Sequence, residues 1–126
     1  MSNLVVSNIS DGTTSVGTGY VVNGSAKAWV NFSSTPSPTV IRDSFSVSSI
    51  TDTGSGNTTV TISSAMSTTS DYATVGNAGN GGTNPGNGYT SSNGITSTTG
   101  HHETMDDSGA NSDRGHNSLI FFGDLA

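Results

Sequence analysis

Residues 101–116 hold most of the side chains in this chain that could bind a metal ion. Imidazole and carboxylate groups are ordinary ligands of divalent metals, and seven of them gather here: His101, His102, Glu103, Asp106, Asp107, Asp113 and His116. Neighbouring residues of a strand point to opposite faces, so His101 and His102 are not expected to share one ion. The segment also lacks the HExxH and EF-hand patterns. We therefore expect a solvated acidic loop with no metal and no cofactor. The alternative is a metal on a trimer axis, held by His101, His102 or His116 of each subunit.

Catalytic patterns are missing as well. The chain has no G-x-S-x-G, and serine is so common that a Ser-His-Asp coincidence carries no weight. Asp106 and Asp107 are sequence neighbours, and neighbouring carboxylates diverge on an extended chain. The glycine-rich tracts lack the lysine of a phosphate-binding loop. The sequence therefore predicts a protein that is not an enzyme.

Three aromatic residues could contact a ligand by stacking: Trp29, Tyr72 and Tyr89. Trp29 with Lys27 would form a plausible sugar platform, but a scaffold role for Trp29 is the preferred interpretation. Tyr89 lies in a Gly/Asn-rich stretch with no periodic core pattern. We therefore take Tyr89, together with His101 and His102, as candidate contacts with a receptor.

Composition limits the partners. The 126 residues are 29% hydrophobic and carry a formal net charge of −6. The basic residues, Lys27, Arg42 and Arg114, are scattered, which argues against nucleic-acid binding. No apolar run approaches the ~20 residues that span a bilayer, so we expect no membrane insertion. The first residues lack the pattern of a secretion signal, and the absence of cysteine leaves the redox compartment open.

Short runs rich in β-branched and aromatic residues predict strands, and no stretch has a sustained helical period. The predicted strands cover 4–9, 19–22, 26–32, 39–51, 58–63 and 71–77, with a bend near Ser44. Asn23-Gly24 suits a two-residue hairpin turn. Alternation places Ala28, Val30 and Phe32 on one face. It likewise groups Ile41, Phe45 and Val47 in the next run, and Val60 with Ile62 in 58–63, and these three sets are the predicted core.

The second half of the chain looks different. Residues 76–117 are rich in Gly, Asn and charged residues and predict a loop-rich excursion. Residues 118–126 predict an apolar C-terminal strand, hydrophobic on both faces, which suits a central strand or an interface strand. Its oligomer-interface candidates are Leu119, Ile120, Phe121 and Phe122. The chain as a whole, 1–126, is expected to form a single all-β domain, a small antiparallel β-sandwich or jelly-roll-like domain with long polar loops.

Residues 23–66, "NGSAKAWVNF…TVIRDSFSVSSITDTGSGNTTVTISSAM", resemble a module of tailed bacteriophages, especially those of marine cyanobacteria and related hosts. In that family an Ala-Lys-Ala-Trp-Val-Asn-Phe strand is followed by a Val-Ala-Ile-Arg-Asp-Ser strand, a Ser-Ser-Ile-Thr-Asp turn and a Gly-rich hairpin. The starting "LVVSNISDGTTSV" and closing "LIFFGDLA" also look like that family's ends. "SSTPSP" (33–38) and residues 99–117 depart from the pattern.

The resemblance implies a virion structural protein on the exterior of a phage particle, of tail-fibre or tail-tip type. It implies no catalytic residues. The expected partners are other virion proteins, further copies of the chain (a homotrimer being favoured), and a glycan or protein of the host surface. The alternative within the virion is a capsid or tail decoration protein with a purely structural role. A third reading is a carbohydrate-binding module.

Overall fold

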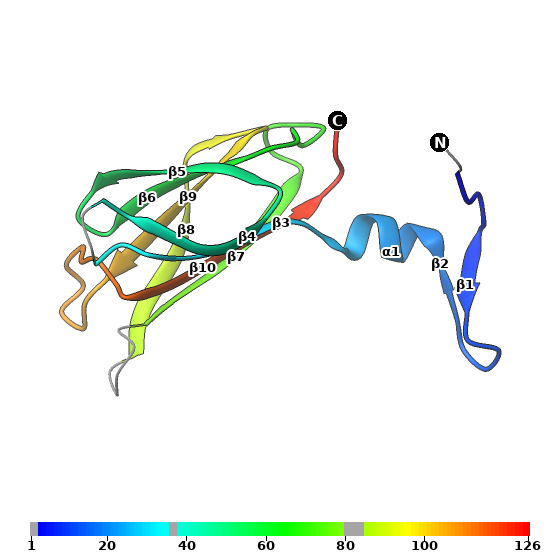
Figure 1. Cartoon of the computed structure of the whole chain (residues 1–126), viewed down its shortest axis with the longest axis horizontal. Helices are drawn as coiled ribbons and strands as arrows, with labels where there is room; N and C mark the ends of the chain where they lie inside the picture. Colours follow the sequence, from blue (N-terminus) through cyan, green and yellow to red (C-terminus); the bar gives the residue numbers. More distant parts are fainter. Residues whose placement is uncertain (1–2, 36–37, 80–84) are drawn as a thin grey trace.

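Residues 26–123 form a sandwich of two antiparallel sheets. The computed structural model describes residues 3–35, 38–79 and 85–126, with the backbone alone for 85–94. Sheet I contains β4 (Val40–Phe45), β3 (Ala26–Ser33), β10 (His116–Gly123) and β7 (Tyr72–Gly79), in that spatial order. Sheet II contains β8 (Pro85–Thr96), β9 (Thr99–Met105), β6 (Asn57–Ile62) and β5 (Val47–Gly54). β7 and β8 join the two sheets through Ala78 and Gly79. The expectation of an all-β, sandwich-like fold is confirmed (Figure 1).

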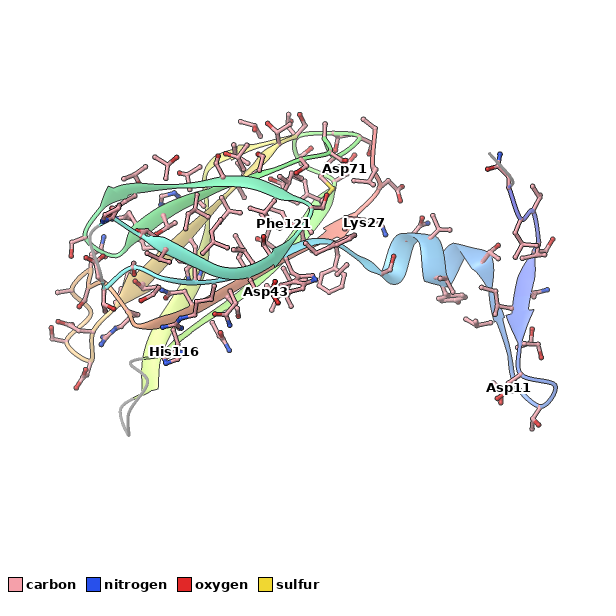
Figure 2. All side chains as sticks on the ribbon, in the orientation of Figure 1. Asp11, Lys27, Asp43, Asp71, His116 and Phe121 are labelled. Atoms are coloured by element: carbon pink, nitrogen blue, oxygen red, sulfur yellow. The ribbon has the colours of Figure 1, made fainter. Side chains whose placement is uncertain are left out.

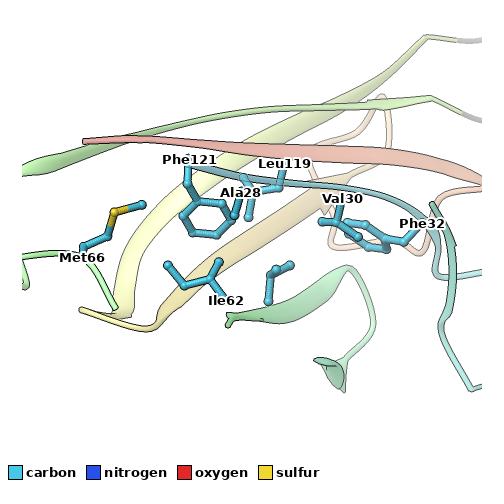
Figure 3. Packing of buried hydrophobic residues seen from close by; sticks show 8 residues of the cluster. Ala28, Val30, Phe32, Ile62, Met66, Leu119 and Phe121 are labelled. Carbon is cyan, nitrogen blue, oxygen red and sulfur yellow. The ribbon is translucent and has the colours of Figure 1, made fainter. Parts of the chain in front are cut away.

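The core lies between the sheets and follows the period-two alternation of the strands. Its buried apolar side chains are Ala28, Val30, Phe32, Val60, Ile62, Met66, Leu119 and Phe121 (Figure 3). The inward assignments for β3 and β6 are therefore confirmed. β10 pairs with β3 on one side and β7 on the other, so the C-terminal strand is central in sheet I. Leu119 and Phe121 point into the core, whereas Ile120 and Phe122 point to the outer face of sheet I, where they are half-buried.

Two glycines give the core its close packing. A Cβ on Gly100 would lie 2.5 Å from Cε1 of Phe121, and one on Gly76 would lie 2.8 Å from Nδ1 of His102. Both distances are shorter than any ordinary carbon contact. The aromatic rings therefore pack directly onto bare backbone of the facing strand, and these glycines serve packing rather than loop formation.

The polar region predicted as a loop is largely sheet. β8, β9 and much of β7 lie within 76–117, so the loop-rich prediction is wrong there; residues 80–84 lie outside the described part. The physical reason is the inward face of β9, which carries Gly100, His102 and Thr104, all buried. None of the three is a typical core residue, so the alternation did not show as a hydrophobic pattern.

The chain passes from sheet I to sheet II at a corner formed by Ser46. Ser46 has a φ of 55°, an uncommon value for a residue with a side chain. Its carbonyl accepts a hydrogen bond of 2.8 Å from the Ser63 amide. The predicted bend near Ser44 thus becomes a break two residues later, between β4 and β5.

A substitution of Gly56 in the β5–β6 hairpin would show how tightly this fold is packed. Its φ is +71°, and a Cβ there would lie 2.3 Å from the Thr104 carbonyl oxygen. We expect Gly56→Ala to lower the free energy of unfolding by about 2 kcal/mol or more, because backbone strain and a backbone clash combine. Urea denaturation measures this. Gly79→Ala, which meets nothing within 4 Å, is the control and should change stability little. Equal losses in both variants would contradict the account.

Residues 3–24 form an arm that extends away from the sandwich (Figure 1). The arm contains β1 (Asn8–Ser10) paired with β2 (Ser15–Gly17), followed by α1 (Thr18–Gly24). The predicted strand at 19–22 with a hairpin turn at Asn23-Gly24 is therefore wrong. A hairpin there would need β3 to pair with 19–22, but β3 already pairs with β10 and β4.

Lys27 closes the C-terminal end of α1. Its ammonium donates to the Val22 carbonyl, to the Ser25 carbonyl at 2.8 Å and to Ser25 Oγ at 2.9 Å. The Ser25 amide also donates to the Val21 carbonyl. A cation at the end of a helix satisfies free carbonyls and opposes the helix dipole. Lys27 thus fixes the joint between arm and sandwich (Figure 2).

Candidate functional site

The three histidines do not converge. His101 lies on the outer face of sheet II, where Nε2 is 3.2 Å from Asn57 Oδ1 and Nδ1 is 3.4 Å from Thr59 Oγ1. His102 points inward and is 1% exposed. His116 lies at the start of β10, where its Nδ1 accepts a hydrogen bond of 2.8 Å from Arg42. The prediction that His101 and His102 face opposite ways agrees with this arrangement.

His102 is a core residue and cannot contact a receptor. Its ring meets Phe32 edge-on, with centroids 5.6 Å apart. Burial lowers the pKa of His102 to about 4, with a further lowering from His101, while Asn117 and the Asn77 backbone oppose the shift. Neither ring nitrogen has a well-formed hydrogen bond. The imidazole therefore stays neutral at physiological pH and packs as a flat, mostly apolar ring.

Two carboxylates of 101–116 accept hydrogen bonds from backbone amides. Asp106 Oδ1 accepts hydrogen bonds from the Ser108 and Ala110 amides, each 2.9 Å, and from Ser108 Oγ. These bonds lower the pKa of Asp106. Asp113 accepts from the Gly56 amide at 2.7 Å. The segment that looked most suited to chemistry thus stabilises turns, as Asx motifs commonly do.

A buried arginine completes this structural role. Arg114 is 5% exposed, and its guanidinium donates to the Met105 carbonyl at 2.6 and 3.2 Å. Its own backbone bonds Ser34 in both directions, and Asn117 donates to its carbonyl at 2.9 Å. Arg114 therefore ties 105–117 to Ser34, directly after β3. Within the residues that the structure describes, no three potential ligands gather in a way that would hold a metal ion.

The outer face of sheet I presents an apolar row across all four strands. Register pairs Phe45 with Trp29, Trp29 with Ile120, and Ile120 with Val75. Phe45 and Val75 are each 56% exposed, and Trp29 and Ile120 are half-buried. Side chains directly opposite one another on neighbouring strands lie in contact. Together with half-buried Phe122, these residues are called the apolar row below.

The apolar row changes two predictions. Phe45, with Ile41, was expected in the core, but both are exposed on the edge strand β4. A signal was present: Asp43 shares their parity, and a charged residue marks an outward face. Of the interface candidates, Leu119 and Phe121 are fully buried in the protein's own core and cannot meet a partner. Ile120 and Phe122 face outward and remain candidates.

The remaining aromatic candidates divide. Trp29 lies in the apolar row, while the Lys27 ammonium turns to α1, so they form no shared platform. Tyr72 packs against Phe121 and donates to the Thr96 and Thr99 carbonyls, and burial raises its pKa. Tyr89 is on β8 opposite Glu103, and its side chain lies outside the described part.

Sheet II has a contrasting outer face. Register places Thr59 between Thr51 and His101, and Asn57 opposite Glu103. The outward positions of β5, β6 and β9 therefore carry hydroxyl, amide, imidazole and carboxylate groups. The outer face of sheet I thus carries an apolar row beside a polar row that includes Asn31 and Ser118, whereas the outer face of sheet II carries hydrogen-bonding groups.

Comparisons of the chain with protein-family models, with curated proteins and with solved structures found no match. Across the part of the chain that the structure describes, no helix has the length and apolar character to cross a membrane.

Proposed function

We propose that this chain is a non-enzymatic structural protein on the exterior of a phage virion, of tail-fibre or tail-tip type. The observation that carries the proposal is the apolar row, in which Phe45 and Val75 are exposed on the outer face of sheet I. Contiguous apolar surface on a folded domain is typical of an assembly contact. The resemblance of residues 23–66 to a phage module supplies the kind of assembly.

The hydrogen-bonding face of sheet II supports a contact with the host surface. His101, Thr59 and Asn57 lie side by side on adjacent strands, where His101 bonds to both of the others and holds this polar surface in place. Glycans and polar protein surfaces are recognised by such groups on rigid elements. In this proposal sheet I faces the particle and sheet II faces outward.

A decoration protein of the capsid or tail is the second candidate, favoured by the arm. A compact sandwich that carries a projecting apolar arm suits attachment to a lattice of other subunits. It needs no host contact at all.

Antibody labelling and cryo-electron microscopy of the particles test both candidates. We expect a few copies at the tail, with sheet II exposed. Many copies over the head lattice would replace the tail proposal by the decoration role. Particles that bind no antibody and show no density for the chain would overturn both candidates.

A further inference from the structure

The sandwich of its own chain supports the arm only at the end of α1, which lies near β10 and Leu125. None of the α1 residues is buried, and residues 3–16 are all exposed. Eight of its apolar residues are exposed to solvent by 40% or more: Leu4, Val5, Val6, Ile9, Val16, Tyr20, Val21 and Val22. Isolated exposed apolar residues are ordinary, but a whole segment of them is not.

The elements of the arm are too small to persist alone. α1 has seven residues, two of them Gly at 19 and 24 and two of them Val, and no side-chain hydrogen bond caps its start. Such a helix is marginal in water. β1 and β2 have three residues each, and a lone two-stranded hairpin is also marginal. The arm therefore needs a surface to pack against.

The arm is held away from its own apolar row. The three hydrogen bonds of the Lys27 ammonium to Val22 and Ser25 fix the end of α1 beside the start of β3. From that joint the arm points away from both sheets (Figure 1). The arm of one copy is consequently free to reach another copy.

The two surfaces match in chemistry and in length. The only charged residue of 3–24 is Asp11, at the hairpin tip. The eight exposed apolar residues of the arm together offer on the order of 900 Å², so the whole arm, and not α1 alone, is needed to reach the ~800 Å² that each partner gives to a standard interface. α1 is about 10 Å long, and the apolar row crosses four strands over about 14 Å.

We infer that the arm of one copy, through α1, packs on the apolar row of a second copy. Each copy then offers one arm and one row, so a closed ring or reciprocal pair covers every such surface. The inference rests on the proposed role as an assembly subunit and names its first partner as the chain itself. Trp29, the only tryptophan, lies in the row and reports on the contact.

The test uses the purified full chain, light scattering for mass and Trp29 fluorescence for contact. We expect a concentration-dependent oligomer whose formation shifts the emission of Trp29 to shorter wavelength. Tyr20→Asp in the arm and Val75→Asp in the row should each raise the dissociation constant about 100-fold or more, because a charge is desolvated in an apolar contact. Thr59→Asp on the opposite face is the matched control and should leave the oligomer intact.

Mixing separates arm-to-row packing from arm-to-arm packing. The Tyr20→Asp chain keeps a good row, and the Val75→Asp chain keeps a good arm, so an equimolar mixture should regain a hetero-oligomer. Thermal unfolding checks that each variant is folded. A wild-type chain that stays monomeric, an oligomer unaffected by Val75→Asp, or a mixture that stays monomeric overturns the inference.

These results do not depend on the virion. An arm-dependent oligomer with no copy on particles would overturn the proposed function alone. A monomer in solution that is found on particles, with its arm on another virion protein, would overturn the inference alone.

Discussion

Removal of residues 118–126 is expected to leave a chain that does not fold. The deletion takes away most of β10, which is central in sheet I, and with it the fully buried Leu119 and Phe121. Each of these side chains alone stabilises the fold by roughly 3 kcal/mol, and a small domain has only ~5–15 kcal/mol in all. Circular dichroism should show no cooperative unfolding transition.

Single substitutions distinguish core from interface on this strand. Phe121→Ala should lower the free energy of unfolding by about 3–5 kcal/mol in urea denaturation. Ile120→Thr, which faces outward and keeps a β-branched residue, should lower it by less than about 1 kcal/mol. A truncated chain that unfolds cooperatively, or an Ile120→Thr loss as large as that of Phe121→Ala, would show that this strand is not the centre of the sheet.

Acid is expected to weaken the fold through His102. Its pKa is about 4 in the folded protein and 6.5 when unfolded, because burial disfavours the charged imidazolium. The unfolded chain therefore binds the proton first as the pH falls. Stability is fully present above pH 6.5 and declines down to about pH 4, by about 3 kcal/mol in all.

Urea denaturation between pH 7 and pH 4 measures this loss. His102→Leu should remove most of it in that window while changing stability little at pH 7, since both ring nitrogens lack good partners. His101→Leu, on the opposite face of β9, is the control and should keep the loss. Hydrogen bonds hold the pKa values of the Asp11 and Asp106 carboxyls below their ordinary range, so the stability that these groups contribute is lost mainly below this window. If the free energy of unfolding of His102→Leu fell with pH as steeply as that of the wild type, this explanation would be wrong.

Much of the sandwich could be predicted from β3, β6 and β10. In these strands most inward positions carry Val, Ile, Leu or Phe, so the alternation is visible in the sequence. β9 was missed because its inward residues are Gly100, His102 and Thr104. Gly100 fits the core because Phe121 packs on it, and His102 fits because Gly76 leaves room for its ring. These partners lie on other strands, so the sequence of β9 alone does not reveal the fit.

The candidate site was predicted less well, for a related reason. The residue types in 101–116 do suit metal binding, but hydrogen bonds of Asp106 and Asp113 to nearby amides use them in turns. The apolar row could not be found from any one strand, since it exists only when Phe45, Trp29 and Val75 are aligned by register. α1 could not be predicted, because Lys27 satisfies its last carbonyls from outside the helix.

The corner at Ser46 has a consequence for solubility. β4 and β5 are the two end strands of the sheet order, and Ser46 links them directly, so the unpaired edges of the two sheets lie on the same side of the sandwich. Strands with free edges are the usual templates for runaway strand addition between molecules. Here the free edges of β4 and β5 lie beside each other, joined through Ser46. Charged side chains on an edge strand discourage such addition, and Arg42 and Asp43 of β4 and Asp52 of β5 provide them at this corner.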